Sequence, residues 1–105
     1  MRKLERAGFV TARSAGSHGP VDVFAGDGLQ CWAIQVKTFK QLTTQETDRI
    51  VRRVNHTDRL NLVVFAEKMM LTPILAIRQG ARKWWLFRLD GAVQHTEIVW
   101  PLVKE

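Results

Sequence analysis

Three polar residues near the start of the sequence have side chains of the types used in metal-assisted hydrolysis of a phosphodiester. Asp22 lies within Val-Asp-Val, and Gln35 and Lys37 lie two positions apart within Ile-Gln-Val-Lys. Mg²⁺ prefers oxygen ligands such as a carboxylate and an amide oxygen, and an ammonium group can orient water or neutralise charge on a phosphate. The residues alone leave a second interpretation open, in which Asp22 caps or solvates a strand and the other two side chains face solvent.

A hairpin of two neighbouring strands is needed to bring these side chains together. Residues 21–25 and 29–37 are strand-like, and the intervening Gly26, Asp27 and Gly28 are typical of a tight turn. The sequence therefore predicts a hairpin at this place.

Side chains alternate along the second strand of this hairpin. Even-numbered residues from 32 to 36 form an apolar face, and odd-numbered residues from 33 to 37, which include Gln35 and Lys37, form the other face. With a two-residue loop at 27 and 28, Asp22 is expected opposite Ala33 and diagonal to Gln35, at roughly 7 to 8 Å between backbone positions. A slip of one residue would move Asp22 to the other face.

The remaining elements are expected to complete an α/β (α+β mixed) fold, a central mixed sheet flanked by helices. Helices are predicted at 2–7, ended by Gly8, and at 44–55, opened by the capping-box pair Thr43 and Glu46. Residues 58–70 suit a helix, although 62–65 also suit a buried strand. Besides the hairpin, strands are predicted at 9–13, 73–78, 83–89 and 96–103.

Composition and charge favour a small folded protein with a polyanionic partner. The 105 residues suffice for a single domain, and sixteen Lys and Arg against ten Asp and Glu give a formal net charge of +6, which suits nucleic acid. No apolar run is long enough to span a bilayer and the start lacks a signal-peptide pattern, so we expect a soluble intracellular protein. Cys31 lies in an apolar run and is expected to be a buried free thiol.

The order of these motifs resembles that of the archaeal-type Holliday junction resolvases, in the PD-(D/E)XK nuclease superfamily. The matching stretches are Gly-Phe at 8–9, Arg-Ser-Ala-Gly-Ser at 13–17, Asp22, and Gln-Val-Lys at 35–37. The resemblance covers nearly the whole chain, least well at 41–57. It implies a restriction-endonuclease-like sheet flanked by helices, and it favours the helix for 58–70.

The resemblance also implies roles for individual residues and for partners. Asp22 would be the principal metal ligand, Gln35 would occupy the second acidic ligand position, and Lys37 would be the catalytic lysine. Arg13 would contact phosphate, and Ser17 matches a loop serine near the scissile phosphate. The family members are homodimers that use Mg²⁺ or Mn²⁺ to make paired cuts in four-way DNA junctions.

Two departures from the family pattern bear on activity. Gln35 stands where the motif usually has glutamate, so a neutral carbonyl replaces a charged oxygen. The family's other catalytic glutamate, on the first helix, would fall upstream of Met1, and Glu5 is too close to Gly8 to replace it. We therefore expect either a first helix truncated at the N-terminus or a degenerate member of the family.

Basic and polar residues outside the three-residue site are candidates for binding DNA, since each neutralised phosphate releases counterions. The candidates are Arg2, Lys3, Arg6, Arg13, Ser14, Lys40, Arg49, Arg52 and Arg53. An ordinary solvated helix face is the alternative for the arginines of 49–53. The adjacent Trp84 and Trp85 should point to opposite sides of a strand, one of them toward a dimer interface unless both pack in the core.

The leading functional hypothesis is a metal-dependent, structure-selective DNA endonuclease that acts on branched DNA as a homodimer. One alternative is a catalytically silent DNA-binding module that retains the nuclease fold. Another is a nuclease of the same superfamily with a different DNA specificity.

Overall fold

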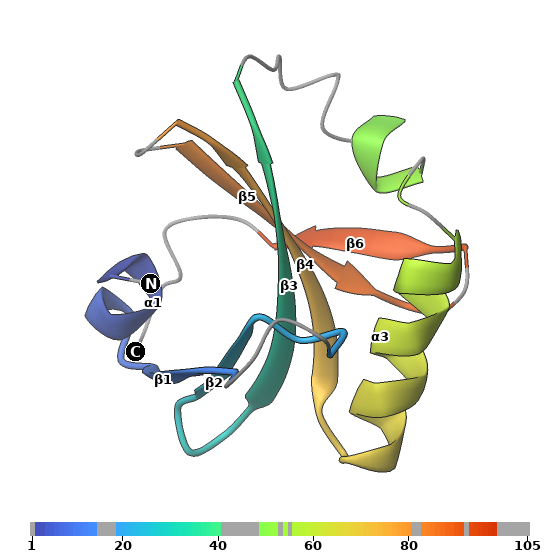
Figure 1. Cartoon of the computed structure of the whole chain (residues 1–105). Coiled ribbons are helices and arrows are strands. Elements are labelled where there is room, and N and C mark those ends of the chain that lie inside the picture. The colour runs from blue at the N-terminus through green and yellow to red at the C-terminus, as the bar shows by residue number, and fades with distance from the viewer. Residues whose placement is uncertain are drawn as a thin grey trace.

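A six-stranded mixed sheet forms the centre of the computed structural model, with the strands side by side in chain order (Figure 1). The structure describes residues 2–14, 19–40, 49–52, 54, 56–80, 83–91 and 93–98, with residues 2 and 3 described by their backbone. The strands are β1 Val10–Arg13, β2 Val23–Gly26, β3 Cys31–Phe39, β4 Thr72–Gln79, β5 Lys83–Leu89 and β6 His95–Ile98. Only the pair β3 and β4 is parallel among these neighbours.

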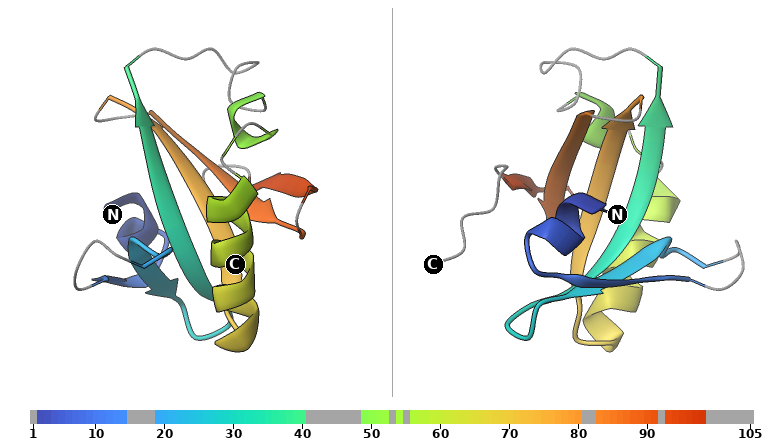
Figure 2. Two further views of the ribbon diagram at one scale, coloured as in Figure 1. Left: turned by 45° about the vertical axis from the view of Figure 1, so that its right-hand side comes forward. Right: turned by 90° about the vertical axis from the view of Figure 1, so that its left-hand side faces the viewer.

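Helices cover both faces of the sheet (Figure 2). Helix α1, Arg2–Arg6, lies on one face, where Leu4 is buried against sheet residues such as Ile34 and Leu86. Helix α3, His56–Lys68, and the helical residues 49–52 lie on the other face. Their buried side chains pack against the sheet residues Ala33, Leu75, Ile77 and Phe87. This arrangement confirms the expected mixed sheet flanked by helices.

Helix α3 confirms the helical interpretation of residues 58–70. Its buried residues Arg59, Leu62 and Ala66 recur at three- and four-residue intervals, as one face of a helix requires. The helix ends in a Schellman motif, in which Leu71 N donates to Ala66 O at 2.7 Å and Met70 has a positive φ of 57°. Periodicity did not distinguish helix from strand because the run 62–65 is apolar at consecutive positions.

The predicted ends of the other elements lie within two residues of the described ends in the structure, except for the helix predicted at 44–55, since Val54 is described and is not helical. Helix α1 stops before Gly8, which has a φ of 91° and donates its N–H to Glu5 O at 3.0 Å. Of the helix predicted at 44–55, residues 49–52 are helical; the capping pair lies outside the described residues. The edge strand predicted at 96–103 is β6, and residues 99–103 also lie outside.

The predicted register of the hairpin is wrong by two residues. Gly26 pairs with Cys31, and Phe24 rather than Asp22 lies opposite Ala33. The cause is a longer turn, since the Asp27 carboxylate accepts hydrogen bonds from the backbone N–H groups of Leu29 and Gln30, each at 2.9 Å. A shift of two residues leaves every side chain on its predicted face.

Cys31 is exposed, so the expectation of a buried thiol is wrong. The residue opens β3 opposite Gly26, which has no side chain with which to cover the sulfur.

The two adjacent tryptophans both pack on the core, Trp84 on the α1 side of the sheet and Trp85 on the α3 side. Within the part of the chain that the structure describes, no helix is long and apolar enough to cross a membrane.

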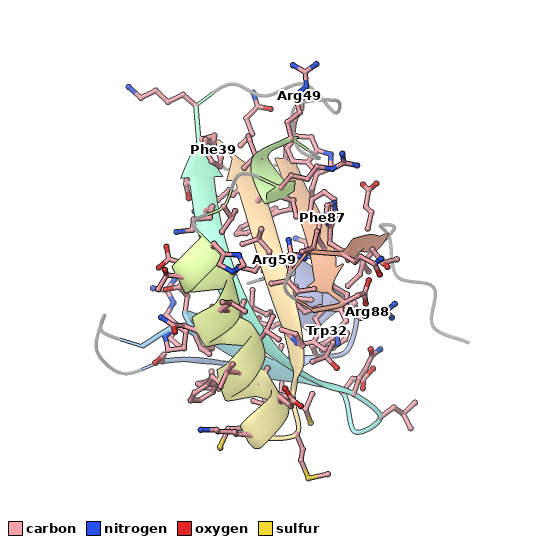
Figure 3. All side chains as sticks on the ribbon, turned by 90° about the vertical axis from the view of Figure 1, so that its right-hand side faces the viewer. Trp32, Phe39, Arg49, Arg59, Phe87 and Arg88 are labelled. Carbon is pink, nitrogen blue, oxygen red and sulfur yellow. The ribbon has the colours of Figure 1, made fainter. Side chains whose placement is uncertain are left out.

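One buried cation ties the turn between β5 and β6 to α3. Arg59 is 4% exposed, donates from Nε to Gly91 O at 3.2 Å, and donates from Nη2 to Gln94 O (Figure 3). Burial lowers the pKa of the Arg59 guanidinium from its ordinary value, and the charge of Asp90 partly offsets this. Hydrogen bonds from Thr96 and then Arg88 lower the pKa of Asp90 in turn. The turn between β5 and β6 is therefore held against α3 by charge-assisted hydrogen bonds.

Candidate active site

Asp22 stands where β2 separates from β3. Its backbone N–H donates to Ile34 O at 2.8 Å, and its side-chain Oδ2 accepts from Val36 N at 2.7 Å. A backbone N–H beyond the end of a ladder needs an acceptor, and the carboxylate provides one. Among the described residues the second oxygen, Oδ1, has no hydrogen-bond partner, and the residue is exposed. The carboxylate is thus held beside β3 at the level of Gln35 and Lys37, and its Oδ1 atom is available to bind a ligand.

Gln35 lies in the middle of the sheet and brings an oxygen that lacks a partner. Its Oε1 atom is buried and, among the described residues, accepts no hydrogen bond. Leaving a buried acceptor unsatisfied costs about 1–3 kcal/mol. A cation beside the Asp22 carboxylate would satisfy this oxygen, so the donor set fits a hard divalent metal.

Lys37 is paired with a residue that the sequence analysis did not assign to the site. Its Nζ lies 3.6 Å from Oδ2 of Asp58 in the first turn of α3, and the side chains are 35% and 45% exposed. A pair this exposed contributes about 1 kcal/mol at most, so the ammonium is oriented yet free to exchange its partner for a phosphate. In the sequence analysis, Asp58 is only the first residue of a predicted helix.

The predicted sharing of a face by Gln35 and Lys37 is confirmed. Ala33, two residues earlier in β3, belongs to the core layer beneath α3, and Lys37 reaches Asp58 of that helix. Both side chains therefore belong to the α3 side of the sheet. Their joint binding of one cation with Asp22 stays a prediction.

The proposed DNA-contacting residues at the start of the chain lie in different places. Ser14 is joined to the site by its N–H, which donates to Asp22 O at 3.0 Å. Arg13 is exposed but lies opposite Val23, whose side chain packs on the α1 side. Arg6 is exposed on α1, and the structure places Arg2 and Lys3 in the same helix by their backbone.

Two of the basic residues after β3, Arg49 and Arg52, lie on the side of the sheet that carries Lys37. Val51 is buried in the core layer beneath α3, and Arg49 and Arg52 on the same helical segment are exposed. Lys40 is exposed at the end of β3. Ser17 and Arg53 lie outside the described residues.

Histidine, cysteine and carboxylate side chains do not form a ready-made metal cluster in this region. Within the described residues, no three of these groups lie close enough together to hold an ion. A cation at the candidate site would depend on one carboxylate and one amide oxygen, completed by water or by the phosphate itself.

Comparison with known proteins points to one family. The model of the archaeal Holliday junction resolvase (Hjc) family matches residues 1–103. The structure is similar to that of Archaeoglobus fulgidus Hjc, a Holliday junction resolvase from an archaeal hyperthermophile. That similarity has a TM-score of 0.57 and 28% identity, and it covers 92% of this chain and 81% of the other. No curated protein matches the chain.

Proposed function

Because this chain belongs to the archaeal Holliday junction resolvase family, we propose that it is a metal-dependent endonuclease that resolves four-way DNA junctions by paired phosphodiester cleavage. The observation that carries the proposal is the unpartnered, buried Oε1 of Gln35 on the face that also holds Lys37, beside the Asp22 carboxylate. Such an activity would serve DNA recombination and repair.

In the proposed mechanism, Asp22 and Gln35 would hold Mg²⁺ or Mn²⁺. When bound, this ion would make a coordinated water more acidic and neutralise charge on the phosphate. Val36 N fixes the orientation of the Asp22 carboxylate, so little rearrangement is needed on binding. Lys37 stabilises the charge that develops on the phosphate, and Asp58 holds the ammonium over the sheet until DNA arrives.

The DNA-contacting roles and the assembly are part of the same proposal. Ser17 would contact a phosphate next to the scissile bond, and Arg13, on the α1 side, would contact a phosphate further away. The exposed Arg49 and Arg52 would hold the backbone on the α3 side, and Lys40 would contact it at the end of β3. Two protomers in a homodimer would make two symmetry-related nicks, because a four-way junction has two equivalent strands to cut.

The test of the proposal compares two labelled DNA substrates. The protein is incubated with a four-way junction and with a linear duplex of the same arm sequence, in Mg²⁺ and in EDTA. We expect paired nicks in the junction, in Mg²⁺ only, and little cutting of the duplex. Equal cutting of both substrates would instead identify a nuclease of another specificity.

A catalytically silent junction-binding module is the second candidate function. It is favoured by the neutral Gln35, since one carboxylate holds Mg²⁺ less tightly than two. Tight binding of the junction in EDTA, with no cutting at any Mg²⁺ or Mn²⁺ concentration, would establish this candidate and exclude the first.

Replacing Gln35 by glutamate is expected to lower the Mg²⁺ concentration needed for cleavage by about tenfold, because charged ligands tighten a site for hard cations. Without metal, the added carboxylate lies buried near Asp22 and should lower the melting temperature, which Mg²⁺ should then restore. Cleavage titrations and thermal melts in Mg²⁺ measure the two effects.

Gln30→Glu is the matched control for this change. It adds the same charge to the same hairpin, but at the exposed turn, where Gln30 Oε1 accepts from the Trp32 indole at 3.1 Å. The control should leave the metal requirement unchanged. Complete loss of cleavage in Gln35→Glu, with the fold intact, would mean that the glutamine is not a metal ligand.

A further inference from the structure

The Asp58 carboxylate lies over the stretch of β3 that carries the candidate site. Asp58 belongs to the first turn of α3, and its Oδ2 atom is 3.6 Å from Nζ of Lys37. Gln35 lies two residues before Lys37 on the same face, about 6.6 Å along the strand. The Asp58 side chain is 45% exposed, so water and ions have access to it. A second carboxylate is therefore present on the α3 side of the sheet, where Oε1 of Gln35 lacks a partner among the described residues.

The side of α3 that carries Asp58 faces β2, the strand that Asp22 precedes. Phe65 lies almost two helical turns after Asp58, so the two side chains lie on the same side of α3. The ring of Phe65 contacts the ring of Phe24 in β2, with 6.2 Å between their centroids. Phe24 follows shortly after Asp22, whose carboxylate accepts a hydrogen bond from the backbone of β3. Asp58 thus lies on the side of α3 that is turned toward the Asp22 carboxylate.

The other carboxylates in the described part of the chain lie away from the candidate site. Helix α1 lies on the opposite face of the sheet, where Glu5 accepts a hydrogen bond from the Thr11 hydroxyl at 3.1 Å. The remaining ones are Asp27 in the β2–β3 turn, Glu67 near the end of α3, Asp90 in the β5–β6 turn and Glu97 in β6. Among the described residues, Asp58 is therefore the carboxylate best placed to supplement Asp22.

The charges at the site give Asp58 a role once DNA is bound. A divalent ion held by Asp22, with Lys37 next to it, leaves two positive charges in excess, and one phosphate neutralises only one of them. The pair of Lys37 and Asp58 is exposed and contributes about 1 kcal/mol at most, so a phosphate can take the ammonium from Asp58. The displaced carboxylate has the charge and the oxygen donors that a hard cation prefers.

We propose that Asp58 is a further ligand of the metal ion, which becomes available when a DNA phosphate takes Lys37 from it. The inference rests on the proposed function and deepens it, because it makes tight binding of the ion depend on bound DNA. In the free protein Lys37 holds the Asp58 carboxylate, and Asp22 and Gln35 are left as the candidate ligands. The site would then hold its ion most firmly when a substrate phosphate is in place.

The test measures Mn²⁺ binding to the full chain without DNA, so that it does not depend on cleavage. The EPR signal of free Mn²⁺ gives the bound fraction. Lys37→Met releases Asp58 as a phosphate would, and we expect it to bind Mn²⁺ about tenfold more tightly than the wild type. Lys37→Met/Asp58→Asn should lose about tenfold of this affinity. Asp58→Asn alone should change the affinity by less than about threefold, because Lys37 already holds the carboxylate in the wild type.

Lys37→Met/Asp58→Asn/Asn61→Asp is the matched control. Asn61 is exposed about one turn further along α3, so this variant restores the charge of the helix but moves the carboxylate away from the site. It should bind Mn²⁺ as weakly as Lys37→Met/Asp58→Asn. Recovery of the full affinity of Lys37→Met would mean that Asp58 acts through its charge alone, and would overturn the inference.

Lys37→Ala replaces Lys37→Met if the methionine variant folds poorly, since the Lys37 side chain is 35% exposed. Equal affinities of Lys37→Met and Lys37→Met/Asp58→Asn would also overturn the inference, and Mg²⁺-dependent cutting of junctions by the wild type would then leave the nuclease proposal intact. Absence of Mn²⁺ binding in the wild type and in Lys37→Met would instead defeat both proposals together.

Discussion

Replacing Asp22 by asparagine is expected to reduce junction cleavage by about a thousandfold or more. The variant removes the one carboxylate at the candidate metal site, and a catalytic metal contributes several kcal/mol at 1.36 kcal/mol per tenfold in rate. An asparagine oxygen can still accept the hydrogen bond from Val36 N, which Asp22 Oδ2 accepts at 2.7 Å. The fold should therefore survive, and the charge alone is tested by single-turnover cleavage in Mg²⁺.

A second variant separates the charge of Asp22 from its hydrogen bond, and a third serves as the control. Asp22→Ala also loses the acceptor for Val36 N, so it should be less stable than Asp22→Asn by about 1 kcal/mol while being equally inactive. Asp27→Asn removes a carboxylate from the turn of the same hairpin and should cut normally. If Asp22→Asn retained a tenth of the wild-type rate, Asp22 would not be the principal metal ligand.

Replacing Arg59 by methionine is expected to lower the free energy of unfolding by about 2–3 kcal/mol. Methionine keeps most of the buried stem but loses the donors to Gly91 O and Gln94 O. Hydrogen bonds to charged groups contribute about 1.5–3 kcal/mol each, and the cost of desolvating the buried guanidinium, which methionine does not carry, offsets part of this loss. At about 4–8 °C per kcal/mol, the melting temperature should fall by roughly 10–20 °C. Urea unfolding and thermal melts measure both quantities.

Arg88→Met is the control for this loss. Arg88 belongs to the same hairpin but is exposed, and its ion pair with Asp90 should contribute less than about 1 kcal/mol. The Arg59 contacts join α3 to the β5–β6 turn. We therefore expect Arg59→Met to hold α3, and with it Asp58, less firmly on the sheet. A loss below 1 kcal/mol in Arg59→Met would mean that water replaces the guanidinium at both carbonyls.

The strand that carries the candidate site could be predicted in its faces but not in its register. Alternation along residues 32–37 placed Gln35 and Lys37 on one side, because a strand has only two faces. The register depended on how Asp27 shapes the turn, and its two side-chain hydrogen bonds lengthen the loop to four residues. The predicted face survived only because the error was an even number of residues.

The contacts between elements far apart in the sequence could not be predicted. Asp58 lies in the helical crossover that joins the parallel strands β3 and β4, and the position of this helix, α3, over Lys37 depends on packing of Leu62 and Ala66 against the sheet. Cys31 illustrates the same limit, since its exposure follows from its partner, Gly26, and not from the apolar run around it.

The sequence by itself determined the residue types of the candidate site, the alternation that puts Gln35 and Lys37 on one face, and the resemblance to a family, because these depend on local order along the chain. Only the tertiary structure decided which partners the site residues meet: Asp58 for Lys37 and Val36 N for Asp22. The physical reason is that strand pairing and helix packing join distant residues, and both are set by the whole core rather than by any one segment.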